Sequence, residues 1–144
     1  MNSFGLQAWQ IYALGSAIFA ALTAILAKIG IKGVDSNLAT AIRTVVILVF
    51  AWAIVWAQGT ANQLRVLEPR TLLFLVLSGL ATGASWLCYF HALKLGPASR
   101  VAPIDKLSVV LVIIFAAIFL KEPMTPKVIL GVAMVAGGAL LLIK

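Results

Sequence analysis

Four ionisable side chains interrupt long apolar stretches of this 144-residue sequence: Arg43, His91, Asp105 and Lys106. Asp105 is one of only four acidic residues in the chain. Inside apolar helices, side chains of these types form ion pairs, bind a charged ligand or relay a proton. Their chemistry therefore depends on whether the surrounding helices bring them together.

A row of hydroxyl groups follows the apolar stretch that starts near residue 71. Ser78, Thr82, Ser85 and Tyr89 recur at i, i+4, i+7 and i+11, a spacing that places them on one face of a helix. The row either lines a polar pathway or forms hydrogen bonds between helices. Beside it, Trp86 and Tyr89 either offer aromatic faces to an organic ligand or belong to an interfacial aromatic belt.

Glycines predict two faces where helices approach closely. Gly79 and Gly83 form a G-x-x-x-G pair, and such pairs let the backbones of two helices come near because no side chain separates them. Gly131, Gly137 and Gly138 predict a second close-packing face near the end of the chain, suited to a subunit interface.

The composition predicts the elements that carry these residues. The sequence is 63% hydrophobic and 10% charged, and its apolar residues come in long blocks. A helix of about 20 residues crosses a hydrocarbon core of about 30 Å, where backbone groups must be satisfied within the helix. The net charge of +7 does not indicate nucleic-acid binding, because the basic residues lie in short connections, as interfacial anchors do.

The sequence therefore predicts an all-α membrane protein embedded in the lipid bilayer, with one transmembrane domain over residues 1–144. Asp35 or Ser36 is expected to cap the second helix, and Thr125 with Pro126 is expected to begin the fifth. The five predicted transmembrane helices cover residues 8–29, 36–57, 71–93, 101–120 and 126–143.

The sequence gives little support to an enzyme. Cys88 is the single cysteine, so neither a disulfide framework nor metal-ligand spacing is present. We find no nucleophile with a matching base and no phosphate-binding loop, and we expect no metal and no cofactor. No basic residue precedes the first apolar run, so we expect a retained helix rather than a cleaved signal peptide.

The distribution of basic residues hardly decides the orientation. Five spans place the two termini on opposite sides, with five basic residues in the connections on the side of the C-terminus and four on the other. Adding Arg43 and Lys106 makes seven against four, which favours a cytoplasmic C-terminus. A balance this close also permits insertion in both orientations.

Sidedness predicts that the ionisable residues form a cluster. Arg43 lies about 10 Å into the second helix, while His91 ends the third and Asp105 and Lys106 begin the fourth on the same side. Adjacent helical residues point about 100° apart, so we expect Asp105 to pair with Arg43 and not with Lys106. The cluster is either a structural salt bridge with a snorkelling lysine or a charged gate or substrate-binding site.

Glu122 ends the fourth predicted helix and lies close in sequence to the start of the fifth. A carboxylate there meets the positive end of a helix dipole, which indicates a structural role.

Four short motifs follow one another from about residue 71 onward: Ala92-Leu93, Pro97-Ala98-Ser99, Leu120-Lys121-Glu122 and Gly131 with Gly137-Gly138. As a set they resemble the EamA domain of the drug/metabolite transporter superfamily. Arg43 also stands where such domains often carry an arginine in the second helix, and Lys121 stands where they usually have glycine.

The resemblance implies a five-helix unit equivalent to half of the ten-helix members. It implies a secondary transporter of a small organic metabolite in the inner membrane, acting by alternating access as a homodimer that is antiparallel if the chain inserts both ways. The first helix has no carboxylate, unlike that of small multidrug transporters, so a coupled proton would fall to Asp105 or His91. The alternative is a non-transporting membrane subunit, or one half of a heteromeric carrier for a lipid-linked sugar.

Overall fold

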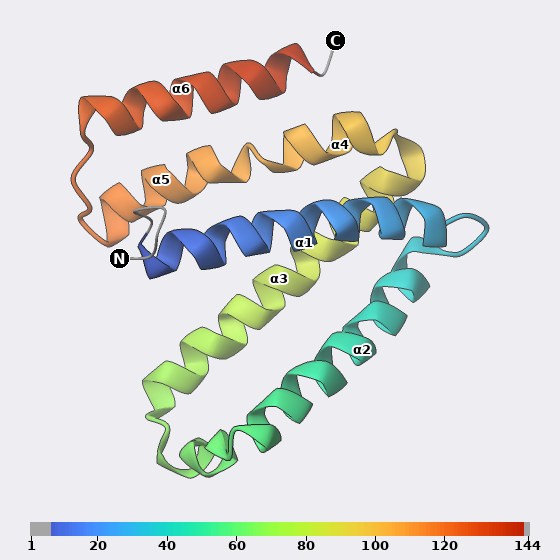
Figure 1. Cartoon of the computed structure of the whole chain (residues 1–144), viewed down its shortest axis with the longest axis vertical. Helices are drawn as coiled ribbons and strands as arrows, with labels where there is room; N and C mark the ends of the chain where they lie inside the picture. Colours follow the sequence, from blue (N-terminus) through green and yellow to red (C-terminus); the bar gives the residue numbers. More distant parts are fainter. Residues whose placement is uncertain (1–6, 143–144) are drawn as a thin grey trace. The chain divides into compact units, whose positions relative to one another are not determined.

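The computed structural model describes residues 7–142, which form helices joined by short connections (Figure 1). No strand occurs in this described part of the chain, and the predicted all-α fold is confirmed. In chain order the elements are α1 (Ala8–Gly30), α2 (Ser36–Ala57), the 3₁₀ helix η1 (Thr60–Val66), α3 (Pro69–Leu95), α4 (Ala98–Asp105), α5 (Ser108–Phe119) and α6 (Pro126–Leu141).

The helices account for the predicted membrane spans. Four stretches are long and apolar enough to cross a bilayer, and α6 is a shorter apolar helix of 16 residues. The predicted end of the last helix at residue 143 lies outside the described residues. The four stretches are Ala8–Gly30, Ser36–Ala57, Pro69–Leu95 and Ala98–Phe119.

Local side-chain chemistry sets two of the helix starts. The carboxylate of Asp35 accepts hydrogen bonds from the backbone N–H groups of Asn37 at 2.9 Å and Leu38 at 3.2 Å. These bonds, led by that from Leu38, hold the pKa of Asp35 below its ordinary value. The Thr125 hydroxyl accepts from the Val128 N–H at 3.4 Å at the start of α6. Both predicted caps are therefore confirmed, with Asp35 rather than Ser36 capping α2.

The fourth span consists of two helices rather than the one predicted over 101–120. Between α4 and α5 the backbone tightens, with hydrogen bonds from Leu107 N–H to the Ile104 carbonyl and from Val109 N–H to the Lys106 carbonyl, both at 3.0 Å. Pro103 lies inside α4 and weakens its hydrogen-bond ladder, because proline has no N–H to donate. Mean hydropathy over the whole span did not reveal this break, because the long apolar run of α5 keeps the mean high.

The end of α5 has an unusual backbone conformation. Lys121 has a φ of 56°, in the left-handed region that glycine tolerates best. The N–H of Glu122 then returns to the Ala116 carbonyl at 3.3 Å. The chain thus closes α5 in the way that many helices end, but without the usual glycine.

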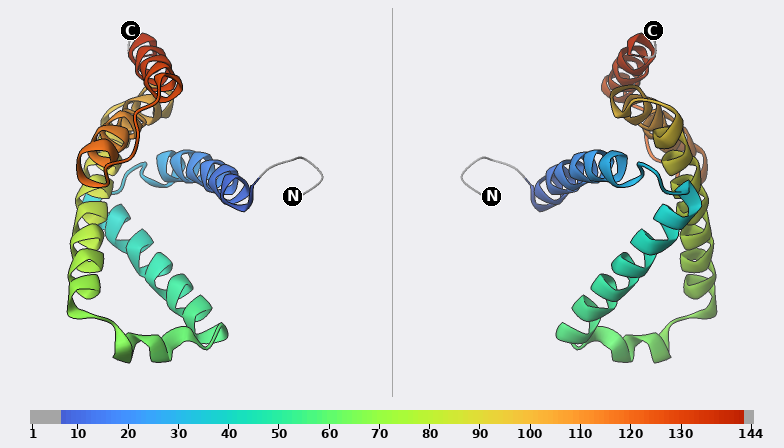
Figure 2. Two further views of the ribbon diagram at one scale, coloured as in Figure 1. Left: turned by 90° about the vertical axis from the view of Figure 1, so that its left-hand side faces the viewer. Right: turned by 90° about the vertical axis from the view of Figure 1, so that its right-hand side faces the viewer.

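The chain divides into two compact units, which we describe separately. Residues Ile29–Lys94 form one unit, which contains α2, η1 and most of α3. In this unit α2 and α3 run antiparallel, lie close together at the Ser36 end of α2 and diverge toward η1 (Figure 2). The other unit holds most of α1 and the chain from Leu95 onward. Within it, α6 packs along α4 and α5 (Figure 1).

Very few side chains are buried among residues 7–142. The buried apolar residues are small in number, and large ones such as Tyr12, Phe50 and Leu141 are 80%, 67% and 78% exposed. Apolar surface on this scale requires cover by lipid or by other helices. The buried apolar residues are Ala24, Ile31, Phe90, Leu93 and Ala139.

Candidate functional site

A polar stripe runs along the first half of α2. Ser36 and Thr40 are only 3% and 5% exposed. The Thr40 hydroxyl donates to the Ser36 carbonyl, and the Thr44 hydroxyl donates to the Thr40 carbonyl, each at 2.8 Å. Threonines in membrane helices commonly satisfy their hydroxyls in this way. We did not identify this stripe from the sequence, although its i, i+4, i+8 spacing is the signal that revealed the row on α3.

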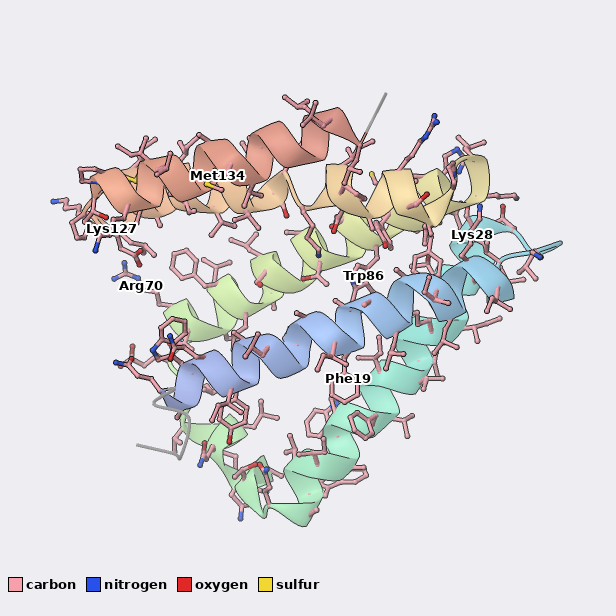
Figure 3. All side chains as sticks on the ribbon, turned by 45° about the horizontal axis from the view of Figure 1, so that its top comes forward. Phe19, Lys28, Arg70, Trp86, Lys127 and Met134 are labelled. Atoms are coloured by element: carbon pink, nitrogen blue, oxygen red, sulfur yellow. The ribbon has the colours of Figure 1, made fainter. Side chains whose placement is uncertain are left out.

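Arg43 lies against two aromatic rings of α3. Its guanidinium carbon is 4.3 Å from the centroid of the Trp86 ring and 5.1 Å from that of Phe90, and Phe90 is 2% exposed. Cation–π contacts of this kind contribute about 0.5–2 kcal/mol each. We call Arg43, Trp86 and Phe90 the Arg43 cradle; Figure 3 labels Trp86 on α3.

His91 lies next to the Arg43 cradle on α3. Its Nδ1 atom is 3.3 Å from the hydroxyl oxygen of buried Ser36. Ser36 faces His91 while Arg43, further along α2, faces Trp86, as two antiparallel helices require. The α2–α3 pair thus carries two of the predicted cluster residues near the end where the helices lie close together, with Arg43 against Trp86 and His91 against Ser36.

Asp105 and Lys106 pair with each other, which contradicts our expectation. The Lys106 Nζ atom is 3.4 Å from Asp105 Oδ2. The expectation of no contact with Lys106 was wrong because the long, exposed lysine side chain can bend back to Asp105 although its backbone keeps helical angles. Asp105 and Arg43 belong to different units, and their pairing stays a prediction.

The hydroxyl row on α3 is largely exposed. Ser78, Thr82 and Ser85 all face outward, and the Thr82 hydroxyl donates to the Ser78 carbonyl at 2.9 Å. Tyr89 is half-buried, with its ring edge-on to Phe90 at 6.4 Å between centroids. Whether the row lines a pathway or bonds to another helix stays a prediction.

The glycines of the two predicted packing faces have open space beside them. A methyl group added to any of them would meet no heavy atom within 4 Å, leaving out the backbone of its own helix. Close helix packing at these positions therefore stays a prediction, as does the interaction of the Glu122 side chain with the start of α6. The glycines are Gly79, Gly83, Gly131, Gly137 and Gly138.

An apolar hollow of about 380 Å³ lies on α2 beyond the polar stripe. Trp52 and Trp56 line it, with ring centroids 6.0 Å apart. Leu48 and Val49 complete its lining. Since all four side chains come from one helix, the hollow is open to whatever surrounds α2.

These features define a multi-pass α-helical membrane protein with charged residues inside its spans, an arrangement typical of proteins that move solutes. The profile of the EamA-like transporter family matches residues 7–144, so the chain belongs to this family. Its membership places the protein in a membrane, which in bacteria is the inner membrane.

A protein of Sinorhizobium sp, named "Uncharacterized transporter in cobO 3'region", is similar to this chain. The two are 59% identical over 136 residues, which cover 94% of this chain and 96% of the relative. No solved structure matches the chain. Both the family and the relative indicate a transporter rather than an enzyme.

Proposed function

We propose that the protein is a secondary transporter that moves a small organic metabolite across the inner membrane by alternating access, as a homodimer. The break in the fourth span carries this proposal. It follows the eight residues of α4, or about 12 Å of helix, and thus falls inside a hydrocarbon core of about 30 Å.

The break is a tightened turn in which Lys106 and Leu107 keep helical backbone angles and their N–H groups stay bonded. A 3₁₀ stretch of this kind inside a helix often marks a functional hinge. Interrupted helices form the substrate sites of many transporters. The break here also carries Asp105 and Lys106, and a charged side chain at the bilayer centre costs about 2.5–3.5 kcal/mol on insertion scales. These features support a solvated path beside α4 and α5.

The exposed surface of the chain supports a dimer. Most of the large apolar side chains among residues 7–142 are exposed in one copy, and a transport path is most simply enclosed by two such units. Many transporters consist of two inverted halves around a site near the midplane. The open space beside Gly131, Gly137 and Gly138 would let the helices of a second copy approach closely. The close balance of basic residues is compatible with an antiparallel pair.

The test is transport by the purified full chain in proteoliposomes, using compounds selected from a metabolite library by their effect on its melting temperature. We expect Asp105→Asn to reduce uptake strongly without changing the melting temperature. Glu122→Gln is the matched control, since it removes a carboxylate outside the spans, and should transport normally.

Wild-type uptake by the Asp105→Asn variant would assign Asp105 to helix packing. If the wild-type protein binds compounds but transports none of them, the protein is a binding subunit instead. Tag accessibility from both sides of the membrane, together with cross-linking, tests the antiparallel dimer. A single orientation would exclude it.

A further inference from the structure

The Arg43 cradle leaves the hydrogen-bond donors of the arginine available. A guanidinium group has five N–H donors, and its contacts with Trp86 and Phe90 engage its charge through the ring faces. Tyr89 adds an electrostatic interaction. Within the described unit Ile29–Lys94, no hydrogen bond or ion pair involves Arg43. Arg43 is thus a partly buried cation held by aromatic rings, with its polar edge unoccupied.

Acidic residues that could neutralise Arg43 are scarce. Asp105 is the only one inside a predicted span, and it already pairs with Lys106 at 3.4 Å. Buried charges are normally paired, so the spans carry more positive charge than the protein itself balances. The other three acidic residues lie in the connections between helices: Asp35, Glu68 and Glu122.

We propose that the Arg43 cradle binds the oxyanion of the transported compound, so that the substrate class is a small organic anion with a flat body. Carboxylate and phosphate groups both match the planar fork of arginine and accept two parallel hydrogen bonds from it. The ring of Trp86, which is half-buried, offers a surface on which a flat organic body can stack. This inference rests on the proposed transport function and adds the charge of its substrate.

The test compares three probes of the same shape and different charge: benzoate, benzamide and benzamidinium. Binding to the purified full chain in detergent is measured as a concentration-dependent rise in melting temperature at pH 7.5. We expect benzoate to bind and the neutral and cationic probes to have no effect. Phenyl phosphate, measured in parallel, shows whether the site prefers carboxylate or phosphate. Equal shifts with all three probes, or no shift with either anion, would overturn the proposal.

Variants locate the site, with a matched control inside the chain. Arg43→Gln should weaken anion binding by about tenfold or more, because it removes a charged hydrogen-bond partner. Arg43→Lys should recover part of the binding, since it keeps the charge but loses the planar fork. Arg70→Gln is the control: Arg70 also lies over a ring, 6.0 Å from the Phe74 centroid, but in the first turn of α3, away from Trp86 (Figure 3).

Anion binding that survives in Arg43→Gln, or that falls equally in Arg70→Gln, would refute the assignment. If Arg43→Gln does not fold, the comparison of Arg43→Lys with the wild type decides. Uptake into proteoliposomes separates this inference from the proposed function. If wild type and Arg43→Lys take up neutral or cationic compounds at equal rates, the anion site is refuted while the transport function is supported. If the protein binds anions but takes up no compound, the transport function is refuted while the anion site is supported.

Discussion

Replacing Lys121 with glycine should stabilise the protein. The φ of Lys121 is 56°, and an L-residue in this left-handed region costs about 1–2 kcal/mol because its Cβ crowds the following carbonyl. Glycine avoids that cost but loses about 0.5–1 kcal/mol more conformational entropy on folding. We therefore expect a net gain of about 0.5–1 kcal/mol. Since about 2–4 °C corresponds to 1 kcal/mol in chains of about this length, the melting temperature should rise by about 1–4 °C.

The measurement is thermal unfolding of the detergent-solubilised chain, followed by the fluorescence of its four tryptophans. Two further variants separate the backbone from the charge. Lys121→Ala removes the charge and keeps the Cβ, so the melting temperature should hardly change. Lys121→Asn should give a smaller gain than glycine, because asparagine tolerates left-handed φ better than other residues with a side chain. An equal rise in Lys121→Ala and Lys121→Gly would show that the lysine side chain, rather than backbone strain, causes the effect.

Two other predictions concern the helix caps. Because the folded state holds the pKa of Asp35 below its ordinary value, its carboxylate stabilises the fold fully above about pH 4 and loses this effect as the pH falls through the lower folded pKa. Melting temperatures between pH 3 and 6 should thus fall more steeply for the wild type than for Asp35→Asn, and parallel curves would contradict this. Thr125→Ala should cost about 1 kcal/mol by removing the cap of α6, whereas Thr125→Ser should melt like the wild type.

The sequence predicted the features that depend only on residues close together in the chain. Asp35 and Thr125 could be identified as caps because capping needs only a side-chain oxygen and the N–H groups that follow it. The bounds of α2 agree with the predicted 36–57, since polar residues flank a continuous apolar run. The expected charged cluster was less accessible, because it depended on helices that are far apart in the sequence.

The contacts of Arg43 show what the sequence did not reveal. A carboxylate was the obvious partner for an intramembrane arginine, yet within its unit Arg43 lies over Trp86 and Phe90. These contacts depend on the angle and register between α2 and α3, which no local pattern encodes. The break before α5 escaped notice for a different reason. The apolar run of α5 keeps the mean hydropathy of the span high whether or not the helix continues through Lys106.

The short length of α6 links this protein to the thickness of its membrane. Its 16 residues extend about 24 Å, about 6 Å less than a typical hydrocarbon core. If α6 crosses the bilayer, as the sequence predicts, the bilayer thins beside it or the aliphatic stem of Lys127 in its first turn carries the ammonium group to the headgroups. Each ångström of mismatch costs a fraction of a kcal/mol. The length of the lipid acyl chains is therefore expected to affect how α6 packs against α4 and α5.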